Sequence, residues 1–202
     1  MVAPRGSPPA ATSVEMPSPM FIVRHGETEW SANGRHTSRT DLPLTEAGRR
    51  RAAALPAELS DQRFALTLCS PLRRARETCR LAGFGEVAEI CEDLREWDYG
   101  EYEGLTTPEI RAINPAWVLW RDGCPGGELP DQIGQRVDRV LDRVRAMNGG
   151  VLAFAHGHVL RVLTARWLRM TPAAGARFAL EAGAVSVLGH ERDTEVISRW
   201  NA

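Results

Sequence analysis

The chain contains no lysine, because all 25 of its basic residues are arginines. This absence excludes a P-loop lysine, a Schiff-base lysine and a Ser-Lys catalytic dyad. Any site that binds an anion must use arginine, histidine, hydroxyl groups or backbone amides instead. A basic excess is lacking too, since 25 basic and 26 acidic residues leave a formal net charge of -1. We therefore expect no nucleic-acid partner.

Long apolar segments are also absent. No apolar run approaches the roughly 20 residues that a membrane-spanning helix needs. The first 18 residues are rich in Pro, Ala and Ser and have no continuous apolar segment of the kind found in secretory signals. We expect residues 1–18 to be a disordered leader, residues 19–202 to form one domain, and the protein to be cytoplasmic with no membrane partner.

Paired cysteine motifs are missing as well. The four cysteines show no C-x-x-C spacing and lie among apolar neighbours; they are Cys69, Cys79, Cys91 and Cys124. Buried free thiols in a reducing compartment are the expected state, and we expect neither a metal nor another cofactor. With 202 residues, 43% of them hydrophobic, the chain can bury a core without covalent or metal crosslinks.

Short apolar segments alternate with longer amphipathic ones. Strands are expected at 20–23, 64–69, 86–91 and 151–155, with a terminal hairpin at 185–188 and 195–200. Helices are expected at 46–59, 71–82, 131–147 and 159–168. Thr45 is predicted to cap the first of these helices, and Pro71 to occupy the first position of the second. The alternation predicts a single doubly wound α/β domain, with a mostly parallel sheet and helices on both faces.

Three predicted strands end in residues suited to chemistry. These endings are Arg24-His25-Gly26, Ser70-Pro71-Leu72-Arg73-Arg74 and His156-Gly157-His158. Ligands of such sheets bind outside the carboxyl ends of the strands, so the three endings predict one site. A histidine beside an arginine at a strand end is a candidate nucleophile.

In chain order, the motifs resemble those of the histidine phosphatase superfamily, the phosphoglycerate-mutase-like proteins. They are Arg24-His25-Gly26-Glu27-Thr28-Glu29-Trp30, Ser70-Pro71-Leu72-Arg73-Arg74-Ala75 and His156-Gly157, and the resemblance extends from about Phe21 to the C-terminus. It implies the doubly wound fold and makes His25 the acceptor of a phosphoryl group. Arg24, Arg74 and His156 would complete the phosphate pocket, and guanidinium groups suit the charge of a transferring phosphoryl group.

A proton donor for the leaving group is expected between residues 94 and 104. The residues alone leave Glu96, Asp98, Glu101 and Glu103 as candidates, and the resemblance selects Glu96 as the general acid.

Further substrate contacts follow from the same resemblance. Ser31 and Thr37 align with phosphate-contacting positions, although Ser31 replaces the usual Asn and Ser38 the usual Gly. Gly157 belongs to the third motif, and Arg121 is a candidate contact for a second anionic group. His158 is expected at the rim or in a structural role. His36 and His190 are expected at the surface, with His36 in the loop expected near the mouth of the site.

Three functions are compatible with these motifs. A phosphatase would discharge phosphohistidine to water, a cofactor-dependent phosphoglycerate mutase would return the phosphate to substrate, and an inactive relative would only bind. The complete set of site residues disfavours the third. Mutases of the family carry a longer insertion and a C-terminal tail, whereas here 15 residues separate Gly104 from Trp120 and the chain ends after its last strand.

The central motifs also resemble short-chain phosphatases, including sedoheptulose-bisphosphatase-like and broad-specificity acid phosphatases. The matching segments are 94–100, 120–124 and 154–158. Hydrolysis of a small phosphorylated metabolite, such as a sugar phosphate or bisphosphate, is the expected activity. A homodimer is compatible with the sequence.

Overall fold

One six-stranded sheet organises the molecule. The computed structural model describes residues 18–202, so the leader expected at 1–18 lies, apart from Ser18, outside the described residues. The strand order is β3-β2-β4-β1-β5-β6. The strands are β1 (Met20–Arg24), β2 (Phe64–Cys69), β3 (Glu89–Ile90), β4 (Gly150–Ala155), β5 (Val185–Glu191) and β6 (Thr194–Arg199). The first four are parallel and the last two form an antiparallel hairpin. The mostly parallel α/β fold predicted from the sequence is confirmed.

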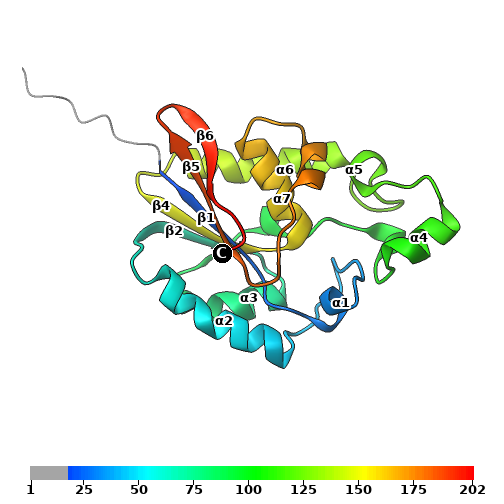
Figure 1. Cartoon of the computed structure of the whole chain (residues 1–202), viewed down its shortest axis with the longest axis horizontal. Coiled ribbons are helices and arrows are strands. Elements are labelled where there is room, and N and C mark those ends of the chain that lie inside the picture. Colours follow the sequence, from blue (N-terminus) through cyan, green and yellow to red (C-terminus); the bar gives the residue numbers. More distant parts are fainter. Residues whose placement is uncertain (1–17) are drawn as a thin grey trace, which may run out of the picture.

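Helices cover both faces of the sheet (Figure 1). The helices α2 and α3 lie on one face, and α6 and α7 on the other, while α1, α4 and α5 gather at one end of the molecule. The bounds are α1 Glu29–Ala32, α2 Glu46–Leu59, α3 Arg73–Leu81, α4 Thr107–Ile113, α5 Leu119–Asp122, α6 Pro130–Arg145 and α7 Gly157–Trp167. Short 3-10 turns are η1 Glu92–Leu94, η2 Gly100–Tyr102 and η3 Pro172–Arg177.

The central strands are buried on both faces. In β1, Phe21 and Val23 pack into the cluster beneath α2 and α3, whereas Met20 and Ile22 pack into the cluster beneath α6 and α7. Successive side chains of a strand point to opposite faces, so a continuous apolar run of this kind feeds two cores. Both cores therefore hold the strand that leads to His25.

Local capping explains where the helices flanking the site begin. The hydroxyl of Thr45 accepts the N–H of Gly48 at 3.0 Å, as predicted for the N-cap of α2. The prediction that Pro71 opens α3 is wrong. Leu72 keeps an extended backbone, α3 begins at Arg73, and the Arg73 N–H donates to Oδ1 of Asp41 at 2.7 Å. The carboxylate that caps this helix comes from a distant loop.

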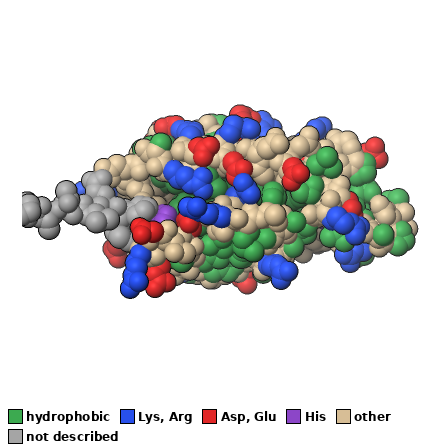
Figure 2. Space-filling view, turned by 90° about the horizontal axis from the view of Figure 1, so that it is seen from above, with side chains coloured by type: hydrophobic (Ala, Val, Ile, Leu, Met, Phe, Trp, Pro, Cys, Tyr) green, Lys and Arg blue, Asp and Glu red, His purple; other side chains and the backbone are tan. Residues whose placement is uncertain are grey.

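The edge strand β3 is shorter than the predicted 86–91, because only Glu89 and Ile90 pair with the end of β2. All four cysteines are buried and free, as predicted. No helix within residues 18–202 has the length and apolar character to cross a membrane. On the face shown in Figure 2, arginine and acidic side chains are interspersed rather than separated.

Candidate active site

The carboxyl ends of three neighbouring strands bring the predicted motifs together. His25 follows β1, Ser70 follows β2 and His156 follows β4, and these strands lie side by side in the sheet. A cleft of about 230 Å³ opens over this edge. Its lining is Arg24, His25, Ser31, Gly34, Arg35, His36, Thr37, Glu96, Tyr99, Thr107, Gly157, His158, Arg161 and Leu180.

One ring nitrogen of His25 is hydrogen-bonded to the backbone, and the other has no hydrogen-bond partner among residues 18–202. Its Nδ1 lies 2.7 Å from the carbonyl oxygen of Gly26, so Nδ1 carries the proton that is donated to this acceptor. Burial lowers the pKa of His25 well below its usual value, and the charges of Arg74 and Arg24 lower it further, although the bond to Gly26 acts in the opposite direction. The ring is therefore neutral, and its Nε2 holds a lone pair.

Gly26 allows the backbone after His25 to pack against α2. A Cβ atom at Gly26 would lie 2.5 Å from the carbonyl oxygen of Gly48, and one at Gly48 would lie 2.3 Å from the carbonyl oxygen of Glu27. Two glycines thus permit two backbones to touch. The Gly26 N–H also donates to Oγ1 of Thr78 at 3.0 Å. The carbonyl that fixes the His25 ring is held from both sides.

Arg24 keeps an unpaired donor beside His25. Its Nη1 donates to the carbonyl of Leu180, but its Nε is buried and has no hydrogen-bond partner within the described structure. A Cβ atom on Gly157 would lie 3.4 Å from this Nε. A buried unsatisfied donor costs about 1–3 kcal/mol, and an anion in the cleft would satisfy it.

Arg74 and His156 lie beneath the cleft, and neither has exposed surface. The Nε of Arg74 donates to Nδ1 of His156 at 3.1 Å, and its other nitrogens donate to the carbonyls of Thr37, Ser38 and Thr40. His156 Nε2 lies 2.7 Å from Oγ of Ser70, and because Nδ1 accepts, Nε2 carries the proton. Burial lowers the pKa of His156 well below its usual value, and Arg74 adds to this.

Glu96 is held by the first turn of α7. Its Oε1 accepts the N–H of Trp97 at 3.0 Å and of Val159 at 2.9 Å, and its Oε2 accepts the N–H of His158 at 3.0 Å. Two of these donors belong to the start of a helix, where backbone N–H groups favour negative charge. The carboxylate therefore has a fixed position at the cleft wall.

Comparison with known proteins agrees with this geometry. The sequence profile of the histidine phosphatase superfamily (branch 1) matches residues 20–202. The chain belongs to this superfamily. An acid phosphatase of Mycobacterium tuberculosis is 40% identical over 176 residues, which cover 85% of this chain and 86% of that protein. Sedoheptulose 1,7-bisphosphatase of Saccharomyces cerevisiae is 36% identical over 179 residues, covering 73% of this chain and 66% of that protein.

A solved structure supports the same assignment. The protein of an open reading frame from Mycobacterium tuberculosis superposes with a TM-score of 0.87 at 38% identity, covering 91% of this chain and 97% of that one. The superfamily that the motifs predicted is therefore confirmed.

Of the four further substrate contacts predicted from the resemblance, three line the cleft and one lies at the surface. Ser31, Thr37 and Gly157 line the cleft. The Ser31 hydroxyl donates to the Thr28 carbonyl at 3.0 Å, and the Thr37 hydroxyl donates to the Arg35 carbonyl at 3.1 Å. The structure does not bring Arg121 to the cleft.

The guanidinium of Arg121 is fixed elsewhere. It pairs with Asp122 at 2.6 Å and donates to the carbonyl of Ala116, and its side chain is exposed. Residues on either side of Arg121 in the sequence, Ala116 and Asp122, therefore hold its guanidinium at the surface near α5. Sequence resemblance alone could not show these contacts.

The cleft also contains histidine and tyrosine side chains that were not predicted as substrate contacts. His36 was expected at the surface, but only 9% of it is exposed, because its Nδ1 and its backbone N–H both donate to the carbonyl of Leu105. Tyr99 and His158 join across the cleft wall, with the phenol oxygen 2.6 Å from Nδ1 of His158.

Arg136 supports the segment that carries Glu96. It pairs with Glu128 at 2.7 Å and donates to the carbonyls of Asp93, Arg95 and Glu96. An arginine beside the apolar positions of α6 is the sequence signal for this inward-facing role.

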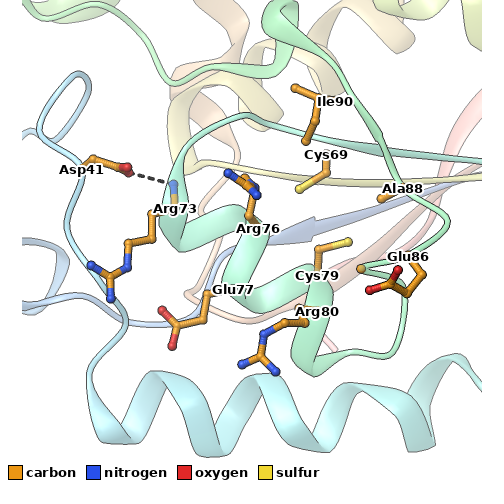
Figure 3. Close-up of a pocket in the computed structure, with 11 residues that line it drawn as sticks. Asp41, Cys69, Arg73, Arg76, Glu77, Cys79, Arg80, Glu86, Ala88 and Ile90 are labelled. Carbon is orange, nitrogen blue, oxygen red and sulfur yellow. Dashed lines mark hydrogen bonds between the residues drawn. The ribbon is translucent and has the colours of Figure 1, made fainter.

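A larger hollow of about 750 Å³ lies along α3, and neither His25 nor His156 lines it (Figure 3). Basic and acidic side chains alternate around it, and the sulfurs of Cys69 and Cys79 lie at its base. His25, Arg24 and Glu96 line the smaller cleft and not this hollow.

Proposed function

We propose that the chain hydrolyses a small phosphorylated metabolite through a phosphohistidine on Nε2 of His25. The observation that carries this proposal is the neutral His25 ring, whose Nδ1 is committed to Gly26 while Nε2 stays available in a cleft lined by Arg24. A neutral imidazole can attack phosphorus without first losing a proton. The cleft, at about 230 Å³, suits a small substrate.

The first step forms the phosphohistidine. Glu96 must carry a proton before this step. Nε2 of His25 bonds to phosphorus, the ester bond from phosphorus to the leaving oxygen breaks, and the Glu96 proton passes to that oxygen. The Nδ1–H bond to Gly26 stabilises the positive charge that develops on the ring. Arg24 contributes its unpaired Nε to the phosphoryl oxygens, and the Arg74 charge acts from beneath.

The second step releases phosphate. Water loses a proton to Glu96 and attacks phosphorus, the bond from phosphorus to Nε2 breaks, and neutral His25 returns with inorganic phosphate as the product. The two relatives named above, an acid phosphatase and a sedoheptulose 1,7-bisphosphatase, support hydrolysis over transfer to a second substrate.

The proposal is tested by His25→Ala. This variant should lose all measurable phosphate release and should form no acid-labile phosphoprotein in a rapid quench with labelled substrate. A chelator should not change wild-type turnover. Substantial turnover by the variant would contradict the assigned nucleophile.

A substrate screen tests the choice between hydrolysis and transfer. Sugar phosphates, phosphoglycerates and nucleotides are each assayed with and without 2,3-bisphosphoglycerate. Phosphate release should exceed mutase turnover for every substrate, and the opposite result would show a mutase.

A further inference from the structure

One guanidinium in the cleft has no role in the chemistry described above. Among residues 18–202, three arginines that are not exposed have no carboxylate oxygen within 4.0 Å: Arg24, Arg74 and Arg161. The first two serve the reacting phosphate. Arg35, which also lines the cleft, is paired with Glu109 at 3.2 Å. Arg161 is therefore a surplus positive charge at the site.

Arg161 is held in a fixed position. Its Nε donates to the carbonyl of Gly175 at 3.1 Å, its Nη2 donates to the carbonyl of Ala176, and its Cζ lies 4.6 Å from the centre of the Trp120 ring. Burial lowers the pKa of Arg161 against the opposing effect of Glu96 and Tyr99. These contacts occupy one edge and one face of the guanidinium. The remaining nitrogen of Arg161, Nη1, has no hydrogen-bond partner among residues 18–202 and is accessible to solvent.

His158 adds a second donor next to Arg161. The Tyr99 hydroxyl is buried, and its one contact in the described structure is Nδ1 of His158 at 2.6 Å. If Nδ1 carried the proton, the hydroxyl hydrogen of Tyr99 would have no acceptor, so the phenol donates and Nδ1 accepts. The proton of the His158 ring is therefore on Nε2, and this N–H has no hydrogen-bond acceptor in the described part of the chain.

The two donors share one surface of α7. His158 and Arg161 are three residues apart, so they lie on the same side of the helix, and both line the cleft. Trp120 packs against both, with ring centres 5.3 Å apart in the case of His158. Nη1 of Arg161 and Nε2–H of His158 have no acceptor among residues 18–202, so a cationic and a neutral donor are positioned to bind the oxygens of an anion.

We propose that Arg161 and His158 bind a second anionic group of the substrate, a phosphate or a carboxylate, while the first phosphate reacts at His25. This inference rests on the proposed phosphatase function and narrows its substrate class to metabolites with two anionic groups. It replaces the surface residue Arg121 as the second anion contact.

The test compares matched substrates that differ in the second anion. Fructose 1,6-bisphosphate is compared with fructose 6-phosphate, and 3-phosphoglycerate with glycerol 3-phosphate. The wild type should prefer the dianionic member of at least one pair in kcat/KM, and Arg161→Gln should reduce that preference by roughly 10- to 100-fold, the size of a charge-assisted contact. The pair that responds distinguishes a phosphate from a carboxylate.

Two further variants separate binding from general damage. Arg161→Lys, which keeps the charge, should retain a preference between those of wild type and Arg161→Gln. Arg177→Gln removes an exposed charge from the neighbouring turn η3 and should leave the preference unchanged. Arg121→Gln is run in parallel, because a loss of preference there and not in Arg161→Gln would overturn the proposal.

Other outcomes are equally decisive. Equal kcat/KM within both pairs for the wild type, or an equal loss for both members of the preferred pair in Arg161→Gln, would overturn the second anion subsite and leave the phosphatase intact. No phosphate release from any of the four substrates would instead contradict the proposed function. Calorimetric binding to His25→Ala then tests the subsite alone: fructose 1,6-bisphosphate should bind more weakly when Arg161→Gln is added.

Discussion

At the scale of single residues, the site works by assigning each histidine nitrogen one role. In His25 only Nδ1 is hydrogen-bonded within residues 18–202, which leaves Nε2 for the proposed attack on phosphorus, while in His156 both nitrogens are bonded to protein. Burial and nearby arginines lower the pKa of both rings. Neutral imidazoles at a cluster of positive charge are therefore part of the native state, and stability must depend on pH.

The free energy of unfolding should fall as the pH drops below about 6.5. In the unfolded chain both histidines titrate near pH 6.5, whereas in the native state their pKa values are lower. Below pH 6.5 the unfolded state therefore binds protons that the native state does not, which favours unfolding. Urea midpoints at pH 8.0 and pH 5.5 measure this difference.

His25→Asn provides the matching variant, because it removes one of the four histidines whose pKa values are lowered; the other three are His36, His156 and His158. Its urea midpoint should vary less between the two pH values than that of the wild type. A wild type as stable at pH 5.5 as at pH 8.0 would show that these rings are already charged in the native state.

At the scale of elements, α6 and α7 position Glu96, the proposed acid, from two sides. The N-terminus of α7 binds the Glu96 carboxylate, and Arg136 of α6 binds the backbone carbonyls of the segment that carries it. The pair of Arg136 with Glu128 is largely buried. Removing one member of such a pair leaves the other charge without a partner.

Arg136→Met should cost about 3–5 kcal/mol of unfolding free energy and lower kcat as well, because Glu96 loses its support. The control is Arg139→Met on the same helix. Arg139 pairs with Asp93, but 62% of its side chain is exposed, so its loss should cost about 1 kcal/mol or less. Urea unfolding and steady-state turnover check both. Equal losses for the two variants would contradict the role given to Arg136.

At the scale of the whole molecule, the two cores share the central strands. The buried tryptophans Trp97, Trp117 and Trp167 all lie in the core beneath α6 and α7, and the core beneath α2 and α3 contains none. Since β1, β2 and β4 belong to both cores, unfolding one face must disrupt the other. We expect residues 20–202 to unfold in one cooperative transition.

Leu55→Ala tests this coupling. Leu55 is fully buried in the core that lacks tryptophan, so the change should cost about 2–5 kcal/mol. The tryptophan fluorescence transition should nevertheless move together with the circular dichroism transition. Ile113→Ala, at a position 71% exposed, should move neither by more than about 0.5 kcal/mol. Separate fluorescence and circular dichroism midpoints for Leu55→Ala would show two independent units.

The sequence predicted what depends on local pattern. The buried runs that became β1, β2 and β4 and the motifs at their ends could be read directly, because strand periodicity and motif order are properties of short segments. Six of the nine predicted site residues line the cleft. Arg74 and His156 lie below it, where their roles toward phosphate stay predictions.

The misses depend on contacts between distant segments. The carboxylate of Asp41 decides where α3 begins, and the carbonyl of Leu105 buries His36. Arg121 was predicted as a second anion contact and Arg161 was not, and only the fold shows that Arg121 is paired at the surface while Arg161 lines the cleft. Such partners are set by tertiary packing, which no local pattern records.

The contact between Glu96 and α7 has an evolutionary consequence. The same carboxylate is the proposed acid and the cap of a helix that begins 61 residues later, at Gly157. A descendant that lost its chemistry would still be selected to keep this glutamate for folding. Relatives that retain it therefore cannot be counted as active enzymes on that ground, and loss of His25, which stabilises no helix end, is the more reliable mark of a silent copy.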